Sequence, residues 1–537
     1  MSDAAGTTLY YYDSYGGYTY KHALIAVSRQ TKQITKTFVY RYDQVGNRVK
    51  MSLGSNSANY GYDANDRLSS FDIASGLTAS YQYDYVGNRT KVTYPNGAYI
   101  DYGYDARNWP TSATSKNSGG SVLASYSYLY DNAGNPTRMT EQDGSYTDWG
   151  YDDVYQLTSD VRKTSGGSTI YSRTFTYDEV GNRTQMISDG QTTDYTYDAN
   201  NKMTVAGGDN FTYDLNGNTI GRTGSSGTAS WTYDYENRML TSTTPQGSAT
   251  LVYDGDGLRV QKTEAGVVRK YVFDGVRLYS EHNANWVEQA RFMTEGDSYY
   301  SPLTAVRTGG AWYYPLYDSL GSTRRVINAS QTVTDSYSYD AFGNVTAQSG
   351  TTYNPYKYVG SLGYWSGDGN TGLQHLGARY YNPLHGRFTT PDPLRDALNG
   401  YWYAGGNPGT DVDPQGLKPN PPGAGDVAKC SAKCGKQCIG TTGKDNLMCY
   451  WGCMALCLGK DAIKKNCGDI VCATKKIHCP GGKDPCRRKK ESADLCQDCC
   501  GVEYFCCVAL NPTSGGLIKC RHTSDACHQK CALCFAN

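Results

Sequence analysis

The cysteine thiols are the side chains whose spacing most directly indicates chemistry. All 19 cysteines of the 537-residue chain lie after residue 429. Two groups of three recur at intervals of four residues, which would place three thiols on one face of an α-helix, and a third group has a similar spacing. The nine cysteines are Cys430, Cys434, Cys438, Cys449, Cys453, Cys457, Cys527, Cys531 and Cys534. We predict paired helices joined by disulfides, whose connectivity the sequence does not define.

Metal binding is the alternative chemistry for these thiols. His478, His522 and His528 stand among the cysteines, and CQDC (496–499) has the spacing of a zinc ligand pair. Regular zinc sites use fewer cysteines in cleaner pairs, however, and few large apolar residues accompany these, so disulfides would have to hold this part together. We therefore predict no metal site and no cofactor. Because 19 is an odd number, at least one thiol is unpaired, bridges two chains or binds another group.

The chain changes composition near residue 417. Residues 1–417 contain no cysteine and carry 33 Lys and Arg against 41 Asp and Glu, a balance of −8. Residues 418–537 carry 18 basic against 10 acidic residues, a balance of +8. Pro and Gly are frequent in 418–429, which is typical of an extended linker. The sequence thus predicts an acidic body, a linker and a basic C-terminal domain at 430–537.

The acidic body is built from a tyrosine-rich repeat. Tyr-Asp recurs mostly every 20 or 21 residues and is often followed by Gly-Asn, as in YDQVGNR (42–48), YDYVGNR (83–89) and YDEVGNR (177–183). The alternation of aromatic and small polar residues before Tyr-Asp is typical of a strand, and Gly-Asn is typical of a turn. One hairpin cannot bury its own face, so we predict that successive hairpins pair into one long sheet. The repeated Tyr and Asp are interpreted as scaffold residues.

These repeats resemble those of the RHS/YD-repeat family over residues 10–417, and are similar to the C components of insecticidal toxin complexes. Segment 372–417 carries GARYYNP, GRF, PDP, GNP and DPQGL, which look like the RHS-associated core. The resemblance implies a mainly β fold in which YD-repeat hairpins (1–345) spiral into a hollow shell, or cocoon. The core (346–417) closes this shell around a small, Cys-rich, helical, disulfide-stapled passenger. After Pro393 the chain has LRDALNG where the family commonly has a glycine-rich stretch, so a different local loop is expected.

The resemblance also implies an aspartyl autoprotease that acts once on its own chain. By position, it assigns Asp392, Asp413 and Arg379 as catalytic residues and Leu417–Lys418 as the scissile bond. Two nearby carboxylates share a proton, so that one can activate a water molecule while the other polarises the scissile carbonyl. The arginine would orient a carboxylate or stabilise the oxyanion.

Without the resemblance, the same aspartates indicate only turns. Asp-Pro is a common turn opening, and GNP and DPQG are typical turn compositions. Asp411 lies two residues before Asp413 and is a second candidate, but the DPxGL register favours Asp413.

The predicted function is toxin delivery, in which the shell encapsulates a C-terminal effector and autoproteolysis releases it. The expected partners are the chain's own C-terminal domain as cargo, an immunity protein, and a second shell subunit or a further N-terminal region. A second shell subunit or a further N-terminal region is expected because family shells usually have more than 417 residues. The basic cluster CRRKKE (486–491) is interpreted as a solvated loop, so nucleic acid is not indicated.

The predicted location is outside the cell or at its surface. A cysteine-rich domain suits an oxidising compartment, although the N-terminus has neither a basic nor an apolar signal region. No run of 18 apolar residues is present, so no membrane span is expected.

Two other functions stay open at this stage. The chain could be a secreted adhesive or filament-forming surface protein whose cysteine-rich tail crosslinks it; the Leu417–Lys418 bond would then stay intact. It could also bind carbohydrate through exposed tyrosine faces, and glycan binding without cleavage would distinguish that function.

Overall fold

One continuous antiparallel sheet forms the body of the protein. The computed structural model describes residues 2–3, 6–12, 24–30, 35–368, 371–394 and 399–417. In this part of the chain 33 strands belong to one sheet, and each strand pairs with the next along the sequence. The mainly β architecture of paired hairpins predicted from the repeat is confirmed.

The strands of this sheet follow one another with short connections. The first are β1 (Ser2–Asp3), β2 (Gly6–Tyr12), β3 (Leu24–Gln30), β4 (Thr35–Tyr42), β5 (Arg48–Leu53), β6 (Asn56–Tyr62), β7 (Leu68–Ala74), β8 (Leu77–Tyr83), β9 (Arg89–Thr93), β10 (Tyr99–Tyr104) and β11 (Pro110–Lys116). Next come β12 (Val122–Tyr130), β13 (Pro136–Glu141), β14 (Tyr146–Tyr151), β15 (Leu157–Lys163), β16 (Thr169–Tyr177), β17 (Arg183–Ser188), β18 (Gln191–Tyr197), β19 (Met203–Ala206), β20 (Asp209–Tyr213), β21 (Thr219–Gly224) and β22 (Ala229–Tyr233). The last are β23 (Met239–Thr244), β24 (Gly247–Tyr253), β25 (Arg259–Glu264), β26 (Val267–Asp274), β27 (Arg277–Asn283), β28 (Glu288–Thr294), β29 (Leu303–Thr308), β30 (Ala311–Tyr317), β31 (Thr323–Asn328), β32 (Val333–Tyr339) and β33 (Val345–Ser349).

The chain divides into two units, Met1–Pro422 and Gly423–Asn537. The second unit lies outside the described residues, as does Lys418. The predicted linker, the helical disulfide-stapled domain and the nine named cysteines all fall there, so these stay predictions, as do the domain limits at residues 345, 417 and 429. Among the described residues, no helix is long and apolar enough to cross a membrane.

The two residues of each Tyr-Asp have different structural roles. Asp84 closes its own turn: its Oδ1 accepts the amide hydrogens of Val86 and Asn88 at 3.1 and 2.8 Å. Tyr83 reaches back across the sheet and donates its hydroxyl hydrogen to the carbonyl oxygen of Leu68 at 2.8 Å. Gly87 has φ of 99°, a conformation that favours glycine. The repeat therefore encodes both the turn and its attachment to the previous hairpin.

The asparagine of Gly-Asn joins neighbouring turns to one another. The Asn88 side chain bonds to Asp84 of its own turn and also donates to Asn108 Oδ1 of the next at 2.9 Å. The same link joins Asn182 to Asn201 at 2.9 Å. Turns at one end of the hairpins are thus connected by side-chain amides as well as by the strands.

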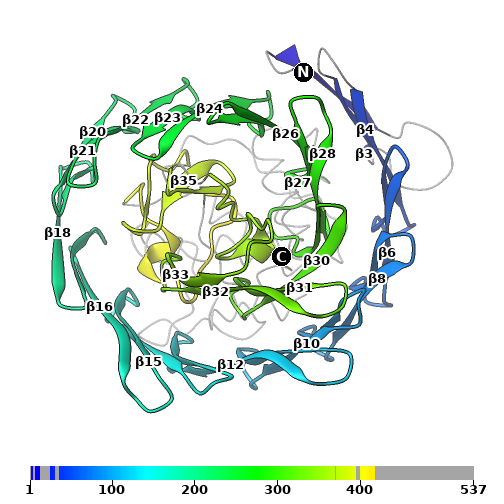
Figure 1. Ribbon diagram of the computed structural model, residues 1–537, viewed down its shortest axis with the longest axis horizontal. Coiled ribbons are helices and arrows are strands. Elements are labelled where there is room, and N and C mark those ends of the chain that lie inside the picture. Colours follow the sequence, from blue (N-terminus) through cyan, green and yellow to red (C-terminus); the bar gives the residue numbers. More distant parts are fainter. Residues whose placement is uncertain are drawn as a thin grey trace, which may run out of the picture. The chain divides into compact units, whose positions relative to one another are not determined.

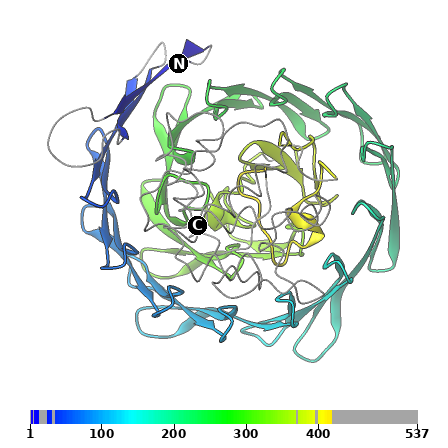
Figure 2. The same ribbon diagram turned by 180° about the vertical axis from the view of Figure 1, so that it is seen from behind.

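The sheet of the first unit coils inward. Figures 1 and 2 show β4–β26 running round the outside and β27–β33 continuing inside them. Buried contacts join the two layers: Tyr94 donates to the Pro315 carbonyl at 2.7 Å, and Arg324 donates to Glu141 at 2.7 Å. One apolar cluster contains residues of both layers, including Phe38, Phe71, Met293, Tyr314 and Ile327. Burial of each aliphatic or phenyl side chain stabilises the fold by roughly 1.5–3 kcal/mol.

The segment after the sheet docks inside this coil (Figure 1, yellow). It contains β34 (Gln374–Leu376), β35 (Arg379–Asn382), β36 (Arg387–Phe388) and the 3₁₀ helices η1 (Gly360–Leu362) and η2 (Ala404–Gly406). Its polar side chains bind to repeat turns: Asn399 donates to Asn182 Oδ1 at 2.7 Å, and Tyr401 donates to the Gly217 carbonyl at 2.6 Å. The YD turns therefore position the segment that carries the candidate site.

Two buried carboxyl groups meet where β15 packs against the turn after β32. Asp160 Oδ2 accepts the amide hydrogen of Ala341 at 2.9 Å, and Asp160 Oδ1 accepts the Tyr171 hydroxyl hydrogen at 3.2 Å. Burial, followed by the nearby Asp340 carboxylate, raises the pKa of Asp160 to about 7. Asp340 itself pairs with Arg173. The folded protein thus holds a proton here at a pH at which an unfolded aspartate has lost it.

We predict that Asp160→Asn flattens the pH dependence of stability. The stabilisation from a raised carboxyl pKa is fully present below about pH 4, the unfolded value, and is lost as the pH rises through about 7. From pH 4.5 to 8, the unfolding free energy of the wild type should fall further than that of Asp160→Asn, by on the order of a few kcal/mol. Urea unfolding at several pH values measures this, with the exposed Asp153→Asn as the control. Parallel curves for wild type and Asp160→Asn would contradict the assignment.

Candidate active site

The structure brings the three predicted catalytic side chains together. Arg379 begins β35, Asp392 follows β36, and Asp413 opens the DPQGL turn. Arg379 Nη2 lies 3.0 Å from Asp392 Oδ2 and 3.3 Å from Asp413 Oδ2. The three side chains are 2%, 8% and 1% exposed, respectively. Two carboxylates from distant positions in the chain therefore meet at one buried guanidinium nitrogen.

The remaining contacts of Arg379 fix its orientation. Its guanidinium carbon lies 3.6 Å from the centre of the Phe388 ring. Nη1 donates to the carbonyl oxygen of Gly400 at 3.0 Å, and Nε donates to the carbonyl oxygen of Gly416. Planar guanidinium groups stack on rings and donate in fixed directions, so the arginine holds the DPQGL turn against the loop that carries Asp392.

The DPQGL turn brings the backbone of Leu417 into contact with the Asp413 carboxylate. Asp413 Oδ1 accepts the amide hydrogen of Leu417 at 3.0 Å, and the Asp413 carbonyl accepts that of Gly416 at 3.1 Å. Gly416 has φ of 64°, and a Cβ there would collide with the carbonyl oxygen of Leu376. The backbone amide of Asp413 donates to the Tyr364 hydroxyl at 2.6 Å. Leu417 is the last described residue, and its carbonyl group belongs to the predicted scissile bond.

This turn is a modified copy of the repeat turn. In the repeat, Asp131 Oδ1 accepts the amide hydrogen of Asn135 four residues on, and Asp131 Oδ2 accepts the side-chain amide of the same Asn135 at 2.8 Å. DPQGL has Leu417 at the position of that asparagine. Asp413 Oδ2 instead faces Arg379, and through it Asp392. The Asp413 carboxylate thus accepts the amide hydrogen four residues on, as in the repeat, while its second oxygen contacts Arg379.

The arrangement suits proton sharing between carboxyl groups. Both carboxyl groups are buried and contact the same guanidinium nitrogen, the kind of paired arrangement in which carboxyl groups can share a proton. Asp411, the neighbouring candidate, is also partly buried, and burial raises its pKa to about 6. The ion pairs of Arg379 nevertheless go to Asp392 and Asp413.

Sequence reasoning missed two residues that complete this site. Tyr364 is fully buried, accepts the Asp413 amide hydrogen and lies 3.1 Å from Tyr403 through their hydroxyl oxygens. Phe388 supplies the ring under Arg379. Phe388 is the last residue of the GRF motif, but no local sequence pattern indicates its contact with Arg379 or that of Tyr364 with Asp413. Within the described ranges, no group of three or more His, Cys, Asp or Glu is arranged to hold a metal.

Comparison with protein families matches most of the sheet and core. The Teneurin YD-shell profile matches residues 117–403, and the RHS Repeat profile matches residues 62–99 and 87–121. The Photorhabdus luminescens Tc holotoxin pore has a similar structure, with a TM-score of 0.63 and 18% identity over 74% of this chain and 23% of the other. At that identity the similarity shows the fold alone.

Three relatives are similar in sequence over parts of the chain. The tRNA3(Ser)-specific nuclease WapA of Bacillus spizizenii is 36% identical over 172 residues, covering 30% of this chain and 7% of that protein. Double-stranded DNA deaminase toxin A of Burkholderia cenocepacia is 29% identical over 194 residues, covering 30% and 13%. Salivary gland surface protein 1 of Aedes aegypti is 36% identical over 110 residues, covering 20% and 3%. The matches thus span only a small part of each relative's length.

We predict that Arg379→Met destabilises the body of the protein. The substitution keeps much of the side-chain volume but leaves two buried carboxylates without their cation, which typically costs about 3–5 kcal/mol. Urea unfolding at pH 8 measures the loss, with the exposed Arg41→Met as the control. Adding Asp392→Asn and Asp413→Asn to Arg379→Met should recover part of it, because the uncompensated charges are then removed. Equal stability of Arg379→Met and Arg41→Met would contradict the site's electrostatics.

Proposed function

This chain belongs to the Teneurin YD-shell family, and we propose that it is a toxin-delivery protein that carries a C-terminal effector. The effector is residues 430–537, joined by the linker 418–429 to the core at 346–417 and the repeats at 1–345. The core frees it by cutting the Leu417–Lys418 bond. Two relatives support this proposal by their names, one a nuclease and one a deaminase toxin.

The observation that carries the proposal is the pair of carboxylates at Arg379, with Leu417 held on one of them. In the proposed reaction, the ionised carboxylate of the pair takes a proton from a water molecule. The water oxygen then bonds to the Leu417 carbonyl carbon, while the protonated carboxyl donates to the carbonyl oxygen. When the C–N bond breaks, a carboxyl proton passes to the nitrogen of Lys418, and Leu417 becomes a new C-terminus.

Three features of this chain favour the reaction. The scissile segment and the carboxylates belong to one chain, so binding has no translational entropy cost. The site is buried, which strengthens each charge interaction. The Arg379 cation, which lies beside both carboxylates, stabilises the negative charge that develops on the Leu417 carbonyl oxygen during the reaction. The pKa values that govern the rate belong to the carboxyl pair rather than to one residue.

The partners and location follow as part of the same proposal. The matched segments cover only 7% and 13% of the nuclease and toxin relatives, and YD-repeat shells usually have more than 417 residues, so a closed shell would draw on a longer chain or a second subunit. An immunity protein would protect the producing cell from the effector. Export to the cell surface or beyond would allow the predicted disulfides to form.

A surface protein is the second candidate function. The similarity to a salivary gland surface protein supports it over 110 residues. In that case the chain stays whole, and its cysteine-rich tail links chains through disulfides that disappear on reduction.

We predict that Asp413→Asn and Asp392→Asn each slow cleavage by roughly 10²-fold or more, since general acid–base catalysis contributes that much. Intact mass under denaturing conditions, with and without reduction, follows the products ending at Leu417 and starting at Lys418. Two control variants should cleave at the wild-type rate: Asp411→Asn, two residues away, and Asp84→Asn, the equivalent carboxylate of a repeat turn.

Either of two results would overturn the autoproteolysis proposal. One is cleavage of Asp413→Asn at the wild-type rate. The other is a wild-type chain that stays whole and forms multimers lost on reduction, which would favour the surface-protein function.

A further inference from the structure

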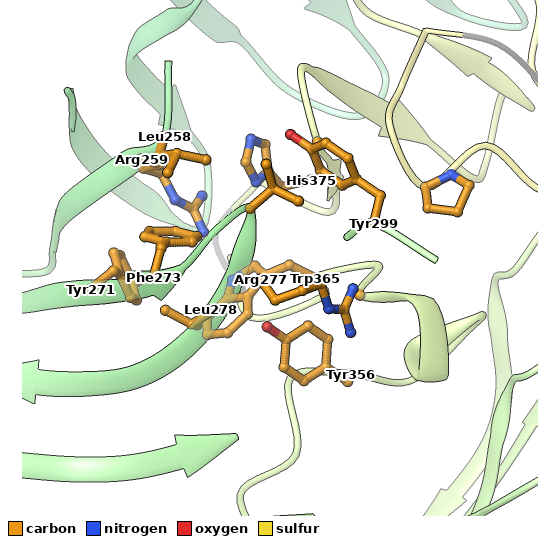
Figure 3. A pocket seen from close by; sticks show the side chains of 14 residues that line it. Leu258, Arg259, Tyr271, Phe273, Arg277, Leu278, Tyr299, Tyr356, Trp365 and His375 are labelled. Carbon is orange, nitrogen blue, oxygen red and sulfur yellow. The ribbon is translucent and has the colours of Figure 1, made fainter. Parts of the chain in front are cut away.

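A cavity lies between β25–β27, the connection from β28 to β29 and the docked core segment (Figure 3). Its wall includes Arg259 of β25, Arg277 of β27, Tyr299 of that connection, and Trp365, His375 and Pro414 of the core. Its volume is about 60 Å³. On the same measure roughly 10–15 Å³ is enough for one water molecule, so there is room for a small polyatomic ligand. Pro414 directly follows Asp413, but the cavity is separate from the carboxylate pair.

Arg277 is the charged group of this wall that lacks a carboxylate. It is 4% exposed, and its Nη2 donates to the carbonyl oxygen of Ser361 at 3.2 Å. Its Nε is buried with no hydrogen-bond partner among the described residues. Burial lowers the pKa of Arg277, and the groups that act in the opposite direction are the hydroxyls of Tyr356, Tyr317 and Tyr299. An arginine stays protonated even so, which leaves a buried cation facing the cavity.

Other buried arginines show how unusual this environment is. Arg48 pairs with Asp274 at 2.9 Å, Arg89 with Glu295 at 2.7 Å, and Arg324 with Glu141 at 2.7 Å. Arg183 has no ion pair in the described part of the chain, but it lies over two phenyl rings, at 4.6 and 4.1 Å from their centres. Arg277 has neither arrangement, so its guanidinium has unused donors next to open space.

The other polar groups of the wall do not supply the missing negative charge. Arg259 is already paired with Asp368 and bonded to Tyr380. Burial lowers the pKa of His375 to about 3, so its ring is neutral at physiological pH. Gly363 has φ of 91°, and a Cβ there would overlap the Arg277 guanidinium. The glycine therefore leaves the space that this guanidinium occupies.

We propose that this cavity is a binding site for a small oxyanion of the phosphate or sulfate class, held by Arg277. The anion oxygens accept hydrogen bonds from the guanidinium, whose planar donors suit oxyanions. Tyr299 lies on the same wall. The bound anion compensates a cation that is otherwise buried unpaired, and it does so whether or not the chain cuts itself.

Equilibrium dialysis of the full chain against inorganic phosphate at constant ionic strength tests this site. One phosphate per chain should bind to the wild type and to Arg41→Gln, which removes an equal charge at an exposed position. Arg277→Gln should bind at least tenfold more weakly. Absence of saturable binding to the wild type, or unchanged binding to Arg277→Gln, would overturn the proposal.

A second measurement keeps the test decisive if Arg277→Gln fails to fold. Wild-type crystals soaked in selenate should show an anomalous peak inside the cavity, with selenate oxygens within hydrogen-bond distance of the Arg277 guanidinium. Density for water alone at that position, in crystals that take up selenate elsewhere, would refute the site.

Discussion

An aspartate carboxylate that accepts the amide hydrogens of its own turn is the interaction on which this structure depends. In YDYVGN, Asp84 closes the turn, Gly87 supplies the left-handed backbone, and Asn88 bonds to the next turn. The preceding tyrosine attaches the hairpin to its predecessor. Repetition of these contacts gives a sheet in which every strand pairs with its neighbour in sequence, and the coil follows when late strands bury their apolar residues against early ones.

The candidate site uses the same interaction for a different purpose. The docked core segment binds to repeat turns through Asn399 and Tyr401, and this places DPQGL inside the coil. There the Asp413 carboxylate still accepts the amide hydrogen four residues on, but the Asp413 amide donates to Tyr364 and Leu417 stands where many repeat turns have asparagine. Arg379 joins the second carboxylate oxygen to Asp392. The candidate site is thus a turn of the repeat type, buried and linked by one arginine to a second carboxylate.

Much of the fold could be predicted from the sequence, because its contacts are local. The patterns that predict strands and turns involve residues of a single repeat of about 20 residues: the alternation in the strands, the turn glycines and the spacing of Tyr-Asp. Asp392, Asp413 and Arg379 could be named only through family resemblance, since Asp-Pro by itself indicates a turn. Tyr364 was missed because its partner Asp413 lies 49 residues further along the chain. The cavity at Arg277 was missed because its wall combines strands of the sheet with residues of the core. The Asp160–Asp340 pair was missed for a similar reason, since its partners come from strands far apart in the chain.

We propose that the chain cuts itself at Leu417–Lys418 by adding water across that bond. The most direct measurement is the intact mass of the wild-type chain made in a protease-free reconstituted translation system in heavy-oxygen water. Hydrolysis at this bond should give a fragment starting at Lys418 and a fragment ending at Leu417 that carries one heavy oxygen in its new carboxyl group. A chain that stays whole, or a fragment ending at Leu417 without the heavy oxygen, would contradict it.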